Sequence, residues 1–254
     1  MPIIYEPRGK AREYSELAAN LYTGCSHACR YCYCPAVLRR TMDQWVREPQ
    51  PRQNVLRELE RDAKKLQGDG REILLSFMSD PYHSDNAACL TREALLLLER
   101  YRLRVQILTK GGLKSCRDFD ILARNHWKYG ATIIFQSERL REKWEPGAAP
   151  IAERIEALRA AHAMGIFTWV SVEPVVDTAE ALGVIAALRD DVNLWKVGKL
   201  NHDRQREAAI DWQRFLADVE SALEGRQYLI KKDLQRFKNL AAGPKTNLEV
   251  RPAM

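Results

Sequence analysis

The stretch Asn20-Leu-Tyr-Thr-Gly-Cys25-Ser-His-Ala-Cys29-Arg-Tyr-Cys32-Tyr-Cys34-Pro35 gathers four of the six cysteines of the chain into ten residues. The cysteines follow directly on the apolar run Leu17–Tyr22, which is typical of a β-strand. The cysteines are therefore expected on the loop after a first strand, where folds that alternate strands and helices place their chemistry. In a reducing compartment, crowded cysteines indicate a metal site rather than a disulfide framework.

Two kinds of metal site are compatible with this loop. Spacings of three and two residues let Cys25, Cys29 and Cys32 wrap three corners of a four-iron cubane, which leaves the fourth iron open to a chelating ligand. The amine and carboxylate of an amino acid would suit that corner. The alternative is a four-thiolate zinc site that includes Cys34. Only one residue separates Cys32 from Cys34, whereas paired zinc ligands usually have about two to four between them.

Outward from the cysteines, short β-type runs alternate with amphipathic helical stretches. The expected strands are Leu17–Tyr22, Ile73–Phe77, Val105–Leu108, Thr132–Phe135, Phe167–Val172 and Leu194–Val197, with an extra one at Gln227–Ile230. The expected helices are Asn54–Leu66, Arg92–Tyr101 capped by Thr91, Ile151–Met164 ended by Gly165, Ala179–Leu188 and Gln205–Leu223.

Six β-then-α units in series predict parallel strands joined by right-handed crossovers. An open doubly wound sheet and a barrel both satisfy that pattern. Because there are six units rather than eight, the pattern favours an α/β fold of the partial (β/α)6 TIM-type barrel kind. We expect residues 1–225 to form this core and residues 226–254 to form a short basic C-terminal extension, a strand followed by a basic tail.

Composition describes an ordinary globular protein of 254 residues, with 46% hydrophobic and 29% charged residues. No apolar run is long enough for a signal sequence or a membrane span, so we expect a soluble cytoplasmic protein without a membrane partner. The net charge of +6 is uneven, because seven basic residues between Arg226 and Arg251 face only Asp233 and Glu249. Such a cluster either faces solvent or faces phosphates, which makes nucleic acid a candidate partner.

Polar side chains follow the expected strands one after another. They are Ser79 and Asp80, then Lys110 beside two glycines, then Ser137, Glu173 and Asn201. Because parallel strands of a barrel end on one rim, these side chains are expected to converge there. An acidic residue leaving a buried strand is costly unless paired, so Glu173 is expected to meet a ribose hydroxyl or a basic residue. Lys196 lies within an apolar run and should have a buried partner such as Glu173 or the substrate.

The pattern Cys-x3-Cys-x2-Cys, with Tyr31 before the third cysteine, resembles the signature of the radical S-adenosylmethionine superfamily. Within it, Tyr31-Cys32-Tyr33 and the later Ser79-Asp80-Pro81-Tyr82 are similar to the spore photoproduct lyase-like branch. The resemblance implies that Cys25, Cys29 and Cys32 ligate a [4Fe–4S] cluster, and that Cys34 has no ligand role.

The same resemblance implies further roles around S-adenosylmethionine. Tyr31 would pack near the adenine, Ser79 and Asp80 would accept the methionine amine, and Asn201 would lie near the cofactor. Ser137 resembles the family residue that reaches the methionine carboxylate. Lys110, which follows the expected strand Val105–Leu108, could pair with the same carboxylate, and the alternative for Thr109-Lys110-Gly111-Gly112 is an ordinary turn.

By superfamily chemistry, a reductant such as flavodoxin or ferredoxin would reduce the cluster by one electron. Cleavage of S-adenosylmethionine would then give methionine and a 5′-deoxyadenosyl radical, which abstracts hydrogen from the substrate. Spore photoproduct lyases carry a hydrogen-donor cysteine two residues before the serine of the Ser-Asp pair, where this chain has Phe77. Tyr33 matches a tyrosine implicated in radical relay, and Tyr82 is a second catalytic candidate.

Three classes of function follow from these patterns. The first is a radical enzyme that repairs or modifies a nucleic acid or nucleotide. The second is a radical enzyme that acts on a peptide or small metabolite, and the third is a zinc-bearing nucleic-acid-binding module. His27, between the cysteines, is expected to be exposed in each of them.

Overall fold

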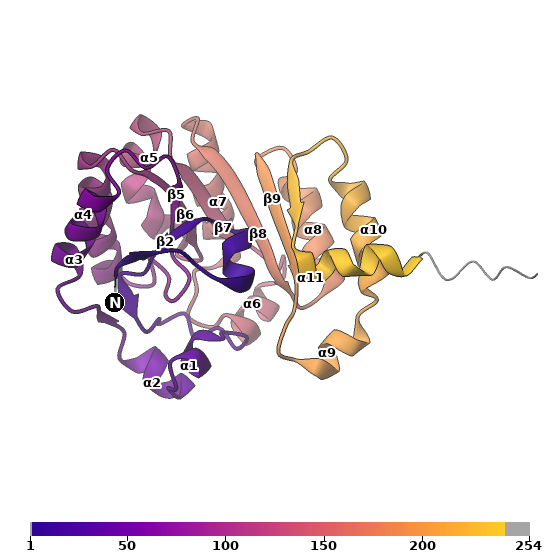
Figure 1. The fold of residues 1–254 in the computed structure, drawn as a ribbon. Coiled ribbons are helices and arrows are strands. Elements are labelled where there is room, and N and C mark those ends of the chain that lie inside the picture. Colours follow the sequence, from indigo (N-terminus) through magenta and orange to yellow (C-terminus); the bar gives the residue numbers. More distant parts are fainter. Residues whose placement is uncertain (1, 242–254) are drawn as a thin grey trace, which may run out of the picture.

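The protein forms a mainly parallel sheet covered on its outer side by helices (Figure 1). The structure is a computed structural model that describes residues 2–241. In spatial order the eight-stranded sheet contains β1 (Ile4–Tyr5), β2 (Leu17–Ala19), β5 (Glu72–Leu75), β6 (Arg104–Thr109), β7 (Lys128–Thr132), β8 (Phe167–Val175), β9 (Leu194–Lys199) and β10 (Tyr228–Ile230). Neighbours from β2 to β10 pair in parallel, and β1 pairs antiparallel with β2 at the edge. A small second sheet joins β3 (Tyr22–Thr23) to β4 (Gln50–Pro51).

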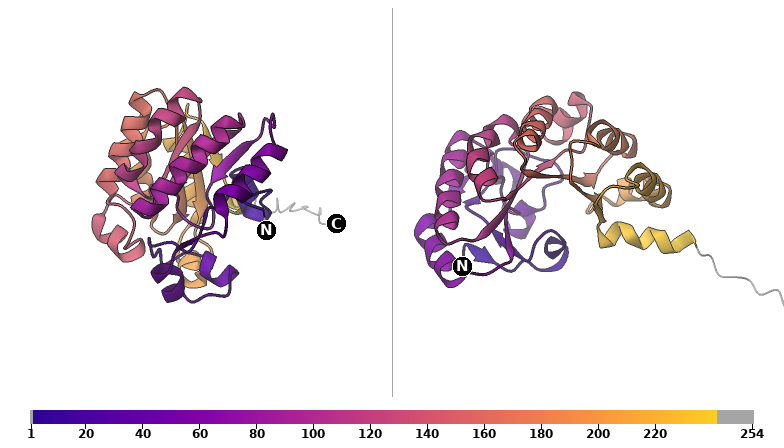
Figure 2. Two further views of the ribbon diagram at one scale, coloured as in Figure 1. Left: turned by 90° about the vertical axis from the view of Figure 1, so that its left-hand side faces the viewer. Right: turned by 90° about the horizontal axis from the view of Figure 1, so that it is seen from above.

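Helices connect the strands, and the longer ones cover the outer face of the sheet. In chain order they are η1 (Gly9–Glu13), α1 (Cys34–Val37), α2 (Met42–Arg47), α3 (Val55–Lys65), α4 (Asp85–Arg100), η2 (Gly112–Asp118), α5 (Phe119–Arg124), α6 (Glu138–Trp144), α7 (Ile151–Ala163), α8 (Thr178–Leu188), α9 (Arg204–Ala209), α10 (Trp212–Ala222), α11 (Lys232–Gln235) and η3 (Arg236–Ala241). Seen from above, the longer helices form an arc around the sheet that does not close (Figure 2). The expectation of a partial TIM-type barrel is confirmed.

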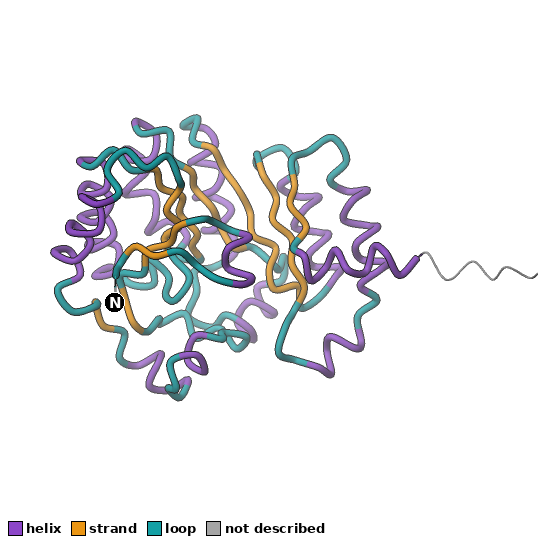
Figure 3. Tube along the Cα trace, in the orientation of Figure 1, coloured by secondary structure: helices purple, strands orange, loops and turns teal. Residues whose placement is uncertain are grey.

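The carboxyl ends of the strands point toward one side of the molecule. The segments that follow β3, β7 and β9 carry the short helices α1 and α2, α6 and α9, all on that side (Figures 1 and 3). In TIM-type folds this is the face that carries the functional loops.

One strand lies earlier than the sequence predicts. The apolar run Ile133–Phe135 is buried but follows β7, which instead spans Lys128–Thr132. The strand contains Gly130, and a Cβ atom there would lie 2.2 Å from Cε2 of Trp169 on β8. The Trp169 ring therefore leaves room only for glycine at position 130. Hydrophobic periodicity does not indicate a strand that contains such a glycine.

Two helix boundaries also differ from expectation. Thr91 does not cap a helix but lies inside α4, where its hydroxyl donates to the Pro81 carbonyl at 2.8 Å. The cap is Ser84, whose hydroxyl accepts from the Ala87 nitrogen at 3.2 Å. The stretch expected as one helix over residues 205–223 is two helices, because Asp211 caps α10 by accepting from the Arg214 nitrogen at 2.9 Å.

The N-terminal segment joins the two edges of the open barrel. After β1 at one edge, η1 reaches the elements at the other, where Glu13 accepts a hydrogen bond from the Lys232 nitrogen at 2.8 Å. Lys231 donates to the Lys10 carbonyl at 3.0 Å, and Lys10 donates to Asn201 at 2.8 Å. Residues 6–14 thus lie across the opening of the barrel.

Within residues 2–241, no helix combines the length and the apolar character needed to cross a membrane. The division into a core of residues 1–225 and an extension of residues 226–254 stays a prediction. Its strand is present as β10, which continues the main sheet. Residues 242–254, where the basic tail was expected, lie outside the described part of the chain.

Candidate active site

A cavity of about 440 Å³ lies at the carboxyl ends of the parallel strands. The cysteine loop, the strand ends and the N-terminal segment all contribute to its wall. Cys25, Cys29, Cys32 and Cys34 line it as free cysteines. The wall therefore brings together thiols and five of the six polar strand-end groups expected to converge there, Ser79, Asp80, Lys110, Glu173 and Asn201.

Backbone contacts hold the cysteine loop in place from both sides. Gly24 has a φ of 101°, and a Cβ atom there would lie 2.7 Å from Cα of Pro49, so a side chain does not fit. The Cys25 nitrogen donates to the Trp45 carbonyl at 3.1 Å. On the other side, the Gly147 nitrogen donates to the His27 carbonyl at 2.9 Å.

The donor set fits an iron–sulfur cluster. Iron–sulfur clusters are ligated by thiolates, and three thiols from one loop line one cavity. Burial raises the pKa of Cys29 to about 12, so ligation must remove its proton. Among residues 2–241, no three His, Cys, Asp or Glu side chains form a group that could hold a single metal ion. A cubane differs from such a site because its three thiolates bind three separate irons.

Cys34 is engaged differently from the other three cysteines. It is the first residue of α1, 3% exposed, and its thiol donates to the Phe77 carbonyl at 3.4 Å. A thiol that donates a hydrogen bond keeps its proton. Its absence from the ligand set stays a prediction that this contact favours.

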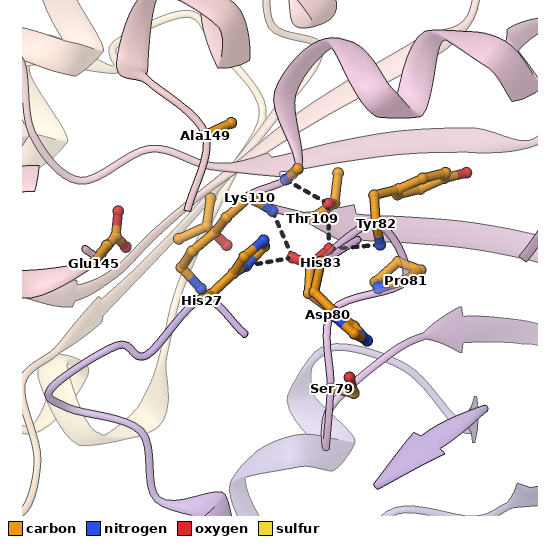
Figure 4. Close-up of polar contacts among 12 residues, drawn as sticks. His27, Ser79, Asp80, Pro81, Tyr82, His83, Thr109, Lys110, Glu145 and Ala149 are labelled. Carbon is orange, nitrogen blue, oxygen red and sulfur yellow. Dashed lines mark hydrogen bonds and ion pairs between the residues drawn. The ribbon is translucent and has the colours of Figure 1, made fainter. Parts of the chain in front are cut away.

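Asp80 is a hydrogen-bond hub between the cysteine loop and the strand ends (Figure 4). Its Oδ1 accepts from the Tyr82 nitrogen at 2.8 Å and the Thr109 hydroxyl at 2.6 Å, and its Oδ2 accepts from the Lys110 nitrogen at 2.6 Å. Burial opposes its charge, but His27 and these hydrogen bonds outweigh burial and lower the pKa of Asp80. An ammonium group that binds Asp80 would donate to a carboxylate that already accepts hydrogen bonds from the protein.

His27 is buried rather than exposed, which contradicts the sequence-based expectation. It is 3% exposed, and its Nδ1 lies 3.5 Å from Oδ2 of Asp80. Burial lowers the pKa of His27 to about 4, so the ring is neutral at neutral pH. The carboxylate of Asp80, which lies 53 residues away in the chain, provides the polar partner that makes burial of the ring acceptable.

A second network holds Tyr31 at the cavity wall. Its hydroxyl donates to Glu145, which also accepts from Nη1 of Arg154 at 2.5 Å. The Glu145 and Arg154 side chains are 0% and 1% exposed, so this ion pair is fully buried. The Nζ atom of Lys110 lies 5.7 Å from the centroid of the Tyr31 ring. Burial lowers the pKa of Lys110, but Cys29, Glu145 and Asp80 outweigh burial and raise it.

Glu173 meets a basic residue, as expected, and also a tyrosine that the sequence analysis missed. Tyr14 donates to Oε2 of Glu173 at 2.5 Å, and Lys231 lies 3.4 Å from the same oxygen. Lys196 does not pair with Glu173. Its Nζ donates to the Tyr14 carbonyl at 3.1 Å and lies 4.0 Å from the centroid of the Trp169 ring system.

Ten of the thirteen residues singled out from the sequence line the cavity, and three do not. Those on the wall are Cys25, Cys29, Cys32, Tyr31, Tyr33, Ser79, Asp80, Lys110, Glu173 and Asn201. Tyr82 is 1% exposed and donates to Asp118 at 3.0 Å, behind the wall. Ser137 caps α6, and Lys196 lies beneath Tyr14. The functional roles of all thirteen stay predictions.

The sequence does not single out one wall residue, Tyr14, or the buried pair behind Tyr31, Glu145 and Arg154. Tyr14 and Glu145 contact residues far away in the sequence, Glu173 and Tyr31, so no local pattern marks them. The one pattern that could have drawn attention is Glu145-Pro146-Gly147, because Gly147 touches the cysteine loop.

The fold and the cavity together define a class of protein, a partial α/β barrel with a cysteine-rich loop between its first two parallel strands. A model of the Radical SAM superfamily matches residues 19–180, more than half of the chain. The chain therefore belongs to the radical SAM superfamily. Proteins of this superfamily use a [4Fe–4S] cluster and S-adenosylmethionine, and they need an external reductant.

One curated relative is an uncharacterized protein of Methanocaldococcus jannaschii. It is 28% identical over 195 residues, which cover 74% of this chain and 71% of that protein.

Solved structures of radical SAM enzymes share the fold. SuiB of Streptococcus suis bound to S-adenosylmethionine has a TM-score of 0.62 at 11% identity, covering 84% of this chain and 49% of SuiB. A spore photoproduct lyase mutant with bound AdoMet and dinucleoside spore photoproduct has a TM-score of 0.60 at 16% identity, covering 85% of this chain and 63% of the lyase. The chain thus spans about half of SuiB and less than two thirds of the lyase.

Proposed function

We propose that this radical SAM enzyme abstracts hydrogen from a nucleic acid or a nucleotide, in a repair or modification reaction. The observation that carries the proposal is the meeting of three free thiols and the strand-end polar groups on one cavity wall. In this proposal Cys25, Cys29 and Cys32 hold the cluster. When bound, the cluster and S-adenosylmethionine supply the 5′-deoxyadenosyl radical for the hydrogen abstraction.

The protein's own part is to bind and orient the cofactor and the substrate and to exclude water from them. Asp80 follows β5, accepts hydrogen bonds from Thr109 and Lys110 at the end of β6, and lies 3.5 Å from His27 of the cysteine loop, so one side chain connects these three segments. Glu145 fixes the Tyr31 hydroxyl, which leaves the ring face available for an adenine. Lys110 supplies positive charge beside Tyr31, suited to a carboxylate.

The likeness to spore photoproduct lyase and the basic residues of the cavity wall support a nucleic acid or nucleotide as the substrate. SuiB, another structural neighbour, has been solved with a precursor peptide, which supports a peptide as the second candidate. Binding to a short DNA strand that falls steeply as salt rises supports the first, because phosphate contacts release counterions. Saturable peptide binding without DNA binding at low salt would favour the second.

Tyr33 is the better of the two proposed radical-relay tyrosines. It lines the cavity, as does Phe77 at the position of the family's donor cysteine, whereas Tyr82 donates to Asp118 behind the wall. Tyr33→Phe should therefore reduce product formation while S-adenosylmethionine cleavage continues. Tyr82→Phe should lower stability and leave the ratio of product to 5′-deoxyadenosine unchanged.

The test of the proposed function is anaerobic reconstitution followed by reduction with dithionite in the presence of S-adenosylmethionine. We expect brown protein that forms 5′-deoxyadenosine, and deuterium transfer into this product from a labelled nucleotide substrate. Flavodoxin or ferredoxin should replace dithionite as the one-electron reductant. Colourless protein that contains zinc and forms no 5′-deoxyadenosine would refute the proposal and favour the zinc-bearing binding module.

A further inference from the structure

Part of the cavity wall is basic and is built from three segments that are far apart in the sequence. Four residues form what we call the basic rim, namely Arg8, Lys10, Lys199 and Lys231. Arg8 and Lys10 belong to the N-terminal segment, Lys199 ends β9, and Lys231 follows β10. The fold therefore brings four cationic side chains to the wall of one cavity, although only Lys231 belongs to the basic cluster seen in the sequence.

Each lysine of the basic rim is held by two acceptors. Lys10 binds Asn201 and Asp233, Lys199 binds the Leu200 carbonyl and Glu207, and Lys231 binds the Lys10 carbonyl and lies 3.4 Å from Glu173. An ammonium group has three N–H donors. Each lysine thus keeps one donor beyond its partners within residues 2–241, while its position is fixed.

Arg8 differs from the lysines because it has no partner. Within residues 2–241 its guanidinium makes no hydrogen bond or ion pair, and the residue is exposed on the cavity wall. The three lysines are balanced by Asp233, Glu207 and Glu173, so Arg8 gives the rim its net positive charge. A planar guanidinium fork matches the oxygens of a phosphate in a bidentate way, and fixed ammonium donors add single contacts.

The rim is built on other segments of the chain than Lys110, the cation that suits the cofactor carboxylate. Lys110, the cation beside Tyr31, is held through its backbone nitrogen by Asp80 in the hub of the cysteine loop. Tyr14 instead ties Glu173 to the N-terminal segment at 2.5 Å, and Glu173 faces Lys231 of the rim. Two cationic regions on one wall can serve two different anionic groups.

We propose that the basic rim binds a phosphate group of the substrate, with Arg8 as its principal ligand. This inference rests on the proposed function and narrows it to a phosphate-bearing substrate. Because η1 links the sheet edges through Lys10 and Lys231, the phosphate site exists only when the N-terminal segment lies across the barrel.

The test is calorimetric binding to the reconstituted, unreduced holoenzyme saturated with S-adenosylmethionine. The probes are thymidine 5′-monophosphate and its uncharged match, thymidine. We expect the monophosphate to bind more tightly, and Arg8→Gln to weaken its binding about tenfold, as the loss of a hydrogen bond to a charged group implies. The matched control is Arg12→Gln, which removes the same charge from η1 outside this cavity and should leave binding unchanged.

Three outcomes would overturn the inference. They are equal binding of both probes, equal binding by Arg8→Gln and the wild-type protein, and competition between the monophosphate and S-adenosylmethionine. The last would assign the rim to the cofactor. Lys199→Gln is a second variant. We expect it to weaken the binding of thymidine 5′-monophosphate and to leave the binding of thymidine unchanged. Formation of 5′-deoxyadenosine by the reduced wild-type enzyme is measured separately, so failure of the proposed function is distinguishable from failure of the phosphate site.

Discussion

The Asp80 carboxylate accepts a hydrogen bond from the backbone nitrogen of Lys110 at 2.6 Å, which ties the loop after β5 to the end of β6. The same carboxylate lies beside His27 of the cysteine loop. A single acidic side chain therefore connects three segments that line the cavity. Family resemblance assigns Asp80 to the cofactor amine, whereas its contacts give it a structural role as well.

Asp80→Asn should lower stability because the new amide must point an N–H at one of the present donors. An unsatisfied buried group costs about 1–3 kcal/mol, so we expect the free energy of unfolding to fall by about 2 kcal/mol. Urea denaturation under anaerobic conditions measures it. Asp85→Asn is the matched control, since its side chain is 89% exposed, and it should change the free energy of unfolding by less than about 1 kcal/mol. Equal effects of the two changes would refute the hub role.

Gly147→Ala should disturb the cysteine loop. A Cβ atom at Gly147 would lie 2.1 Å from the Ser26 carbonyl oxygen, so the loop must shift to admit it. We expect iron content per chain after reconstitution to fall by more than half, and stability to fall by about 1–3 kcal/mol as for other overpacked sites. Gly70→Ala is the control, because a Cβ atom there meets nothing within 4 Å. Full iron content in Gly147→Ala would show that the loop tolerates the shift.

Cys25→Ala, Cys29→Ala and Cys32→Ala should each abolish cluster assembly, because each removes one of the three proposed thiolate ligands. Cys34→Ala should retain the cluster, since its thiol donates to the Phe77 carbonyl. Iron and sulfide content per chain, with the visible absorption spectrum, measures the result. Cys89→Ala, at an exposed cysteine, controls for general effects of cysteine removal. Loss of iron in Cys34→Ala together with full iron in Cys32→Ala would reassign the ligands.

The fold could be predicted where strands are continuous buried apolar runs. Ile73, Leu74 and Leu75 are all fully buried in β5, as the apolar run indicated. The prediction was wrong for β7, because Ile133–Phe135 has the same apolar character but packs beyond the strand end. Local periodicity records burial, and it does not distinguish a buried strand from a buried segment that follows one.

The candidate site could be predicted only as far as its motifs extend. The cysteine spacing and the positions after the strands identified ten residues that line one cavity wall. The contacts that hold them could not be predicted, because Tyr14 and Glu173 are 159 positions apart and Tyr31 and Glu145 are 114 apart. No local pattern encodes such pairs.

Lys196 should make stability depend on pH in a way that one substitution can isolate. Its side chain is almost fully buried, and burial followed by repulsion from Lys128 lowers its pKa to about 8. Lys231 acts in the same direction and Glu72 opposes it. The pKa of a lysine in the unfolded chain is about 10.4, so the unfolded chain holds this proton more tightly than the native protein does.

The sign of the effect follows from proton linkage. Below about pH 8 both states are protonated and the native state bears the full cost of a buried ammonium. Between about pH 8 and about 10 that cost disappears, so the contribution of Lys196 to stability should rise by about 3 kcal/mol. Lys196→Met removes this pH-dependent contribution to stability. The Tyr14 carbonyl is not left without a donor, because it still accepts a hydrogen bond from Gln106 at 3.2 Å.

Urea denaturation of Lys196→Met and the wild-type protein at pH 7 and pH 10 tests the prediction. We expect the stability of the variant relative to the wild-type protein to fall by about 3 kcal/mol between these pH values, because only the wild-type protein gains from deprotonation. Lys114→Met, at a side chain that is 47% exposed, is the control and should show a difference that does not change with pH. The prediction is wrong if the difference in free energy of unfolding between Lys196→Met and the wild-type protein is also the same at both pH values. The Lys196 ammonium would then be solvated in the native state, in spite of its position over Trp169.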